Sequence, residues 1–167
     1  MKRFKKELKD MTDDKFLQAY ELYKKTVFSV IYSYTKNADD AAELSQDTFI
    51  SLYTYDGSFD SDEHMKAWLI RVAINNCNNL FRSKKHLSAS PIPEDLPSEE
   101  QHEPDEIIGE VMKLPEKYRI PIHLFYYEEY SVCEIVEILE LPEATVKTRL
   151  KRGRDKLKKT LRKEDWL

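Results

Sequence analysis

Residues 131–162 have the sequence SVCEIVEILELPEATVKTRLKRGRDKLKKTLR. Ser131 and Glu134 match a capping box, in which the side chain of each residue accepts a hydrogen bond from the backbone amide of the other at a helix start. Apolar residues follow at helical spacing, and Pro142 then marks the start of a second helix. Two helices joined by a short turn, the second rich in Lys and Arg, predict a DNA-binding helix-turn-helix.

This second helix separates an apolar side from a basic side. At about 100° per residue, the stripe expected to face the core contains Val146, Leu150, Gly153, Leu157 and Leu161. The candidate DNA contacts are Thr145, Lys147, Thr148, Arg149, Lys151 and Arg152. We expect Thr148, Lys151 and Arg152, which lie opposite the apolar stripe, to contact base edges. C-terminal cations such as Lys159 are expected to contact phosphates. A solvated basic helix or a coiled-coil seam is the alternative, but neither requires a capped preceding helix.

The composition favours helices and a reduced environment. Of the 167 residues, 35% are charged and only three are glycine. Cys77 and Cys133 match no metal spacing, so free thiols are expected rather than a disulfide, with a redox-sensing pair as the alternative. His64, His86, His102 and His123 form no ligand cluster. The sequence therefore predicts no metal, no cofactor, no catalytic residue and no enzymatic activity.

The charge is segmented along the chain. The net charge is −4, but residues 64–86 and 141–163 are strongly basic, whereas 10–63 and 87–140 are acidic. Each basic segment is a candidate contact for a polyanion. No segment is apolar and long enough to cross a membrane, and the N-terminus lacks the apolar core of a signal peptide. We therefore expect no membrane insertion and a cytoplasmic location.

Residues 87–106 contain four prolines and several carboxylates but no Lys or Arg, which predicts an extended acidic linker. The predicted architecture is all-α, with two small helical domains at 1–86 and 107–167. The helices expected outside the helix-turn-helix span 14–35, 39–53, 62–85, 106–113 and 114–128. Asp60 and Glu63 are expected to cap the third, and Pro121 is expected to kink the last.

The helix over 62–85 carries no carboxylate after Glu63. Two apolar faces leave one polar strip, which indicates that the helix is sandwiched in its domain. The candidate nucleic-acid contacts on and beside this strip are Trp68, Arg71, Asn75, Asn78, Asn79 and Arg82. Arg and Asn suit base edges, and aromatic rings stack on exposed bases. An ordinary solvent-facing strip is the alternative.

Together these segments resemble the extracytoplasmic-function (ECF) sigma factors of bacterial RNA polymerase. LPEKYR at 114–119 and PEATVKTRL at 142–150 are similar to the domain of that family that recognises promoters. AELSQDTF at 42–49 is similar to the segment that binds the polymerase clamp, and AWLIRVA at 67–73 with Asn75 is similar to the segment that melts DNA. The resemblance covers residues 14–86 and 107–163.

The resemblance implies that the two halves of the chain bind different promoter elements. Residues 1–86 would be sigma region 2, in which Trp68 wedges the opened −10 element and the loop from Asp56 to Asp62 forms a pocket for a flipped base. Residues 107–167 would be sigma region 4, which recognises the −35 element as duplex. The residues that would bind polymerase are Glu43, Leu44, Gln46 and Asp47. The implied partners are core RNA polymerase, promoter DNA and an anti-sigma factor.

Three positions depart from the family. Asn79 stands where an aspartate is common, which removes a salt bridge to Arg82. Glu129 and Glu140 stand in turns where glycine is usual. Because glutamate at positive φ is strained, we expect these turns to take another geometry.

Two other functions fit parts of the sequence. A stand-alone helix-turn-helix regulator would bind DNA tightly without polymerase and would use residues 1–86 to sense or dimerise. An adaptor that does not bind DNA would need neither basic segment. A pull-down with core polymerase separates the first of these from a sigma factor.

Overall fold

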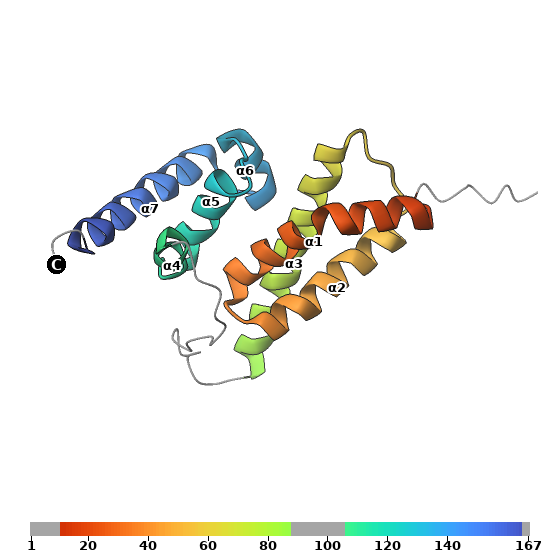
Figure 1. The fold of residues 1–167 in the computed structure, drawn as a ribbon, viewed down its shortest axis with the longest axis horizontal. Coiled ribbons are helices and arrows are strands. Elements are labelled where there is room, and N and C mark those ends of the chain that lie inside the picture. The colour runs from red at the N-terminus through yellow and green to blue at the C-terminus, as the bar shows by residue number, and fades with distance from the viewer. Residues whose placement is uncertain (1–10, 88–105, 165–167) are drawn as a thin grey trace, which may run out of the picture.

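The computed structural model describes residues 11–87 and 106–164, and this part of the chain is all-α (Figure 1). Its helices are α1 (Asp13–Thr35), α2 (Ala38–Thr54), α3 (Asp62–Leu87), α4 (Glu106–Met112), α5 (Glu116–Tyr126), α6 (Val132–Leu139) and α7 (Glu143–Glu164). Each begins and ends within about two residues of the prediction, which is the ordinary uncertainty of helix ends. The all-α prediction is confirmed. Residues 1–10, most of the expected linker and His102 lie outside the described residues.

Helices α1, α2 and α3 form one bundle, at the right of Figure 1. Leu69, Ile70, Ala73, Ile74 and Cys77 on α3 are buried, while the remaining apolar residues of its two faces are half-buried. Helix α3 contacts α1 and α2 and also α6 of the other unit. The prediction that this helix is sandwiched in its domain is confirmed by its contacts with α1 and α2, and a third neighbour, α6, comes from the C-terminal half of the chain.

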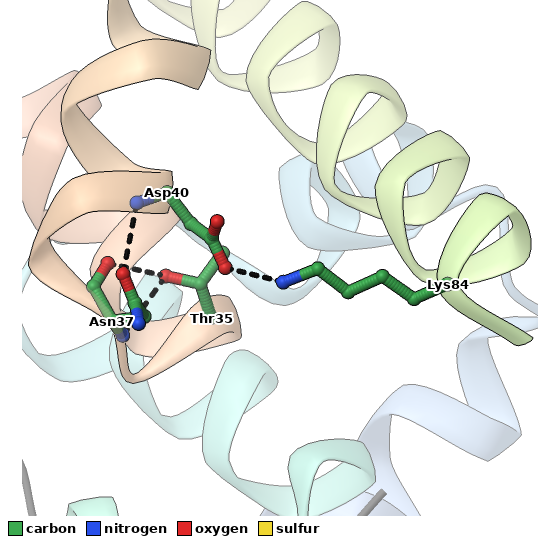
Figure 2. A network of polar contacts seen from close by, with 4 residues as sticks. All are labelled: Thr35, Asn37, Asp40 and Lys84. Atoms are coloured by element: carbon green, nitrogen blue, oxygen red, sulfur yellow. Dashed lines mark hydrogen bonds and ion pairs between the residues drawn. The ribbon is translucent and has the colours of Figure 1, made fainter. Parts of the chain in front are cut away.

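A polar network fixes the junction between α1 and α2 (Figure 2). The Asn37 side chain accepts a hydrogen bond from the Asp40 amide at 2.9 Å, which caps α2. Thr35 Oγ1 donates to the Asn37 carbonyl at 3.1 Å. Lys84 Nζ lies 2.6 Å from Asp40 Oδ2, so the same capped turn also holds the C-terminal part of α3.

The start of α3 differs from the prediction. The residue that caps α3 is Ser61, whose Oγ accepts a hydrogen bond from the His64 amide at 3.1 Å. The Ser61 carbonyl accepts from the Met65 amide. Asp60 instead donates its amide to His64 Nδ1 at 3.2 Å. The predicted cap at Asp60 is wrong by one residue, because both residue types are good caps and their order alone does not decide between them.

Helices α4 to α7 form the second unit, at the left of Figure 1. The capping box at Ser131 is present, with the Ser131 amide donating to Glu134 at 2.8 Å. These hydrogen bonds lower the pKa of the Glu134 carboxyl. Helix α5 continues through Pro121, which is buried among its neighbours. The stripe predicted on α7 faces inward: Val146, Leu150 and Gly153 are buried.

The two glutamates in glycine-like turns adopt the left-handed conformation, with φ of 58° at Glu129 and 53° at Glu140. The expectation that these turns take another geometry is wrong. At the end of α6 the Glu140 amide donates to the Val136 carbonyl, so the cap forms as it would with glycine. The left-handed conformation costs a non-glycine residue about 1–2 kcal/mol, and Lys36, with φ of 52° at the end of α1, adopts it as well.

Replacing Glu140 with glycine is expected to raise the free energy of unfolding by about 0.5–1 kcal/mol. Relief of the left-handed strain outweighs the larger conformational entropy that glycine loses on folding. Glu137→Gly, inside α6, is the matched control and should lower stability by about 1 kcal/mol. Urea denaturation followed by circular dichroism measures both. A loss of stability in both variants would show that the turn is not strained.

The two units are in contact. Helix α1 packs against α5, and α3 packs against α6. The Arg119 guanidinium crosses between them: it donates to the Ser33 carbonyl of α1 and, at 2.7 Å, to the Leu114 carbonyl of its own unit. The arrangement is therefore closed, with the first bundle and the second lying side by side.

Candidate nucleic-acid interface

Close packing at one glycine sets the position of α7. A Cβ atom at Gly153 would lie 2.8 Å from Ile122 Cγ1 of α5 and 3.5 Å from Tyr118 Cβ. Only a residue without a side chain allows α7 to approach α5 this closely. The helix is therefore held with its inward stripe on α5 and its opposite side directed to solvent.

The outward side of α7 carries the residues predicted to contact base edges. Thr148, Lys151 and Arg152 are exposed, as is Lys147, whereas Thr145 and Arg149 are half-buried. A hollow of about 370 Å³ separates the N-terminal half of α7 from the start of α5. Its lining includes Lys117, Ala144, Thr148 and Arg152. Of the predicted −35 residues, Thr145, Thr148, Arg149 and Arg152 thus line one hollow, which does not include Lys147 and Lys151.

Two side chains on this surface have partners that orient them. The Arg152 side chain lies beside the Tyr118 hydroxyl, and its interaction with that hydroxyl lowers the pKa of Tyr118. Lys147 Nζ lies 2.5 Å from Glu143 Oε1, one helical turn earlier. That hydrogen bond raises the pKa of Lys147 and lowers the pKa of Glu143. Arg152 is therefore directed by the neighbouring helix α5, whereas Lys147 is directed only by its own helix.

The residues of the predicted polar strip on α3 lie in different environments. Arg71, Asn75, Asn79 and Arg82 are exposed, whereas Asn78 is half-buried. Arg71 Nη2 donates to the Glu137 carbonyl of α6 at 2.7 Å. Asn78 lines a crevice with Leu139, Leu141 and Arg149 of the second unit. Part of the strip is therefore engaged by the helix-turn-helix unit.

Trp68 lies in an aromatic cluster at the open end of the bundle. Its ring centroid is 4.8 Å from that of Tyr55 and 5.6 Å from that of Phe59. Phe59 and Tyr55 in turn lie 5.0 Å apart. The half-buried Trp68 is thus held at the base of the loop between α2 and α3, the loop in which the resemblance implies a pocket.

A cavity of about 460 Å³ adjoins this loop. Gly57, Phe59 and Ser61 line it from the loop, and Leu22, Tyr23 and Met65 line it from the helices. Tyr23 also donates its hydroxyl hydrogen to the Asp62 carbonyl at 3.0 Å, which anchors the start of α3 to α1. The loop predicted to form a pocket therefore borders one.

The candidate polymerase contacts do not share one environment. Glu43, Gln46 and Asp47 are exposed along one side of α2, whereas Leu44 is buried in the bundle with 8% of its surface exposed. The same exposed side continues into Ile50 and Tyr53, which are 60% and 43% exposed. Sequence reasoning missed these two residues. Their signal is helical spacing: Ile50 stands one turn beyond Gln46 and Asp47, and Tyr53 one turn beyond Ile50.

The comparisons with known proteins agree with this geometry. Sigma-70 region 2 matches residues 19–87, and Sigma-70 region 4 matches residues 105–157. The ECF RNA polymerase sigma factor SigW of Bacillus subtilis is 34% identical over 94% of this chain and 94% of its own length. The chain belongs to the ECF sigma factors.

A further relative agrees with this membership, and two solved structures share the fold. The ECF sigma factor SigM of Bacillus subtilis is 30% identical over 84% of this chain and 91% of its own length. The sigma factor RpoE of Bartonella quintana, solved with the anti-sigma factor NepR, has the same fold. Its TM-score is 0.72 at 20% identity, over 90% of this chain and 98% of that one. CnrH, solved with the cytosolic domain of CnrY, gives a TM-score of 0.64 at 23% identity, over 90% and 89% of the two chains.

Membership in this family decides between the predicted functions. This chain is a promoter-recognising sigma factor and not an enzyme, and the stand-alone regulator is not favoured. Within residues 11–87 and 106–164 no cluster of His, Cys, Asp or Glu could hold a metal ion. No helix in that part of the sigma factor is long and apolar enough to cross a membrane.

The two cysteines of the sigma factor are free and differ in environment. Cys77 is buried on α3, and burial raises the pKa of its thiol to about 12. Cys133 is exposed on α6. Because the thiolate is the reactive form, Cys77 is protected from alkylation and oxidation in the folded chain.

Proposed function

We propose that this sigma factor binds core RNA polymerase through the exposed side of α2 and holds promoter DNA at two places. Residues 1–86 act as sigma region 2 on the −10 element, and residues 107–167 act as sigma region 4 on the −35 element. Residues 87–106 connect them. The observation that carries the proposal is the presence of two separate basic surfaces, on α3 and on α7, each held by its own bundle.

At the −35 element, α7 enters the major groove of the duplex. Thr148, Lys151 and Arg152 contact base edges, because they are exposed and lie on the side of α7 opposite its buried stripe. The remaining candidates, Thr145, Lys147 and Arg149, flank them and contact the backbone. Lys159 and the other cations toward the C-terminus add contacts with phosphates that do not depend on sequence.

At the −10 element, α3 holds the melted strand. The exposed side chains of Arg71, Asn75, Asn79 and Arg82 offer donors to bases and phosphates. Trp68, supported by Tyr55 and Phe59, stacks at the edge of the opened duplex. The cavity beside the loop has the size and the aromatic wall to accept one flipped base.

The partners follow from the same proposal. Glu43, Gln46 and Asp47 meet a basic surface of core polymerase, and Leu44 supports α2 from inside the bundle. A protein that acts with polymerase on the chromosome works in the cytoplasm. The RpoE structure is of a sigma factor bound to the anti-sigma factor NepR, and we include an inhibitory partner of that kind in the proposal.

Charge reversal on α2 tests the assignment of the polymerase surface. Glu43→Lys and Asp47→Lys should each weaken binding to core polymerase about tenfold, the factor that corresponds to 1.4 kcal/mol. Glu129→Lys makes the same charge change on the exposed surface of the second unit and should leave the affinity unchanged. Biolayer interferometry with purified core measures all three. Equal affinities for all variants would place the polymerase surface elsewhere.

A further inference from the structure

Tyr55 joins the loop between α2 and α3 to Trp68. It follows α2 directly, and its amide donates to the Leu52 carbonyl at 3.2 Å. The Tyr55 ring centroid lies 4.8 Å from that of Trp68 and 5.0 Å from that of Phe59. Phe59 and Trp68 are farther apart, at 5.6 Å. Because aromatic rings attract one another at these separations, Tyr55 is the ring that holds the other two together.

The Tyr55 ring has room to lie in this position because residue 57 is a glycine. A Cβ atom at Gly57 would lie 2.6 Å from Tyr55 Cε1 and closer still to the tyrosine hydroxyl oxygen. The φ angle of Gly57 is not positive, so its backbone conformation alone would admit a larger residue. The absence of a side chain therefore serves the ring, which packs both on the loop backbone and on Trp68.

The same loop borders the places where DNA is proposed to bind. Gly57 and Phe59 line the cavity of about 460 Å³ that is proposed to accept a flipped base. Trp68, which is half-buried, lines a separate hollow of about 210 Å³ together with Arg71. Part of the indole is therefore packed against Tyr55 and Phe59, and part is open to a ligand. Tyr55 thus connects the wall of the cavity to the ring that is proposed to stack on DNA.

We propose that Tyr55 is a positioning residue for promoter opening: it holds Trp68 in the orientation that stacks on the edge of the melted −10 element, and Gly57 leaves the space for its ring. The inference rests on the proposed function of Trp68. A side chain that is already held in its bound orientation loses less entropy when the ligand arrives. Stacking tolerates every base, because each has a π-face. Tyr55 therefore affects how fast a promoter opens and not which promoter is chosen.

The rate of promoter opening by the complex with core polymerase tests this directly. The template is a promoter fragment on which the wild type directs initiation, with 2-aminopurine in its −10 element to report unstacking in stopped flow. Tyr55→Leu should slow opening about fivefold, the effect of one side chain that must be ordered during the reaction. On the same fragment with mismatched bases across the −10 element, no pairs remain to be broken. Transcript yield from that template should therefore approach the yield of the wild type.

A second variant moves the ring without removing it. Gly57→Ala places a methyl group against the Tyr55 side chain and should also slow opening. Gly109→Ala is the matched control: among the described residues, an added Cβ there would meet no atom of another helix within 4 Å, and opening should keep its wild-type rate. In a chain that already carries Tyr55→Leu, Gly57→Ala should cause no further loss, because it acts through the ring. Losses that add fully would contradict the proposal.

Two results would overturn the inference. If Tyr55→Leu opens the duplex promoter at the wild-type rate, the ring positions nothing. If it loses as much transcript on the mismatched template as on the duplex, its role is merely structural. Trp68→Ala separates this inference from the proposed function. A variant without the indole that opens the duplex as fast as the wild type overturns the role proposed for Trp68, whereas a defect in Trp68→Ala without one in Tyr55→Leu overturns only the inference.

Discussion

Replacing Arg119 with leucine is expected to lower the free energy of unfolding by about 3 kcal/mol. Burial lowers the pKa of this guanidinium, yet it remains charged and donates to the Ser33 and Leu114 carbonyls. Hydrogen bonds from a charged donor are worth about 1.5–3 kcal/mol each, and their loss leaves buried carbonyls without partners. Helix α1 has no basic residue in its last turn, and the Arg119 guanidinium, bonded to the Ser33 carbonyl there, lies at the negative end of its dipole.

Two controls define what Arg119 contributes. Arg119→Lys keeps the charge but loses the fork of donors, so it should fall between the wild type and Arg119→Leu. Lys25→Leu, on the exposed side of α1, should change stability by less than about 0.5 kcal/mol. Chemical denaturation at neutral pH measures all three. If Arg119→Leu is as stable as Lys25→Leu, the guanidinium does not hold the two units together.

Replacing Arg152 with alanine is expected to weaken binding to −35 duplex DNA by about 1–3 kcal/mol and to relax preference at one base position. Lys159→Ala should instead weaken binding evenly across sequences and lower the dependence of affinity on salt. Anisotropy titrations against a set of single-base variants at several salt concentrations distinguish the two. Equal effects of both substitutions on all sequences would contradict the roles given to these residues.

The interaction between Arg152 and the Tyr118 hydroxyl refines this prediction. Tyr118→Phe removes the hydroxyl that orients the guanidinium but keeps the ring against α7. We expect the same base position to lose preference, by less than with Arg152→Ala, while the salt dependence stays at the wild-type value. A merely structural role for Tyr118 would instead weaken all sequences equally.

Much of the fold follows from local signals in the sequence. The Ser131 capping box, the spacing of Val146, Leu150 and Gly153, and the two apolar faces of α3 are each set within a few turns of one helix. Such patterns depend on side chains that the sequence names directly. The two basic surfaces were predictable for the same reason.

The contact between the two units was not predictable, because its decisive partners are backbone atoms. Arg119 bonds to carbonyls that the sequence does not distinguish from any others, and Arg71 bonds to the carbonyl of Glu137. Leu44 shows that a motif can assign a buried residue to a binding surface. The motif placed Leu44 among the polymerase contacts, whereas its position on α2 directs it into the core. Glu140 shows that the hydrogen bonds of a helix cap can accompany a φ that the residue type disfavours.

Run-off transcription by core RNA polymerase tests the central claim most directly. Purified protein, added to core on a library of promoter fragments, should direct initiation at defined start sites that core alone does not use. Arg71→Ala, Arg82→Ala and Arg152→Ala combined should abolish these transcripts while binding to core is retained. Absence of initiation on every fragment, or initiation that survives the triple substitution, would contradict the account.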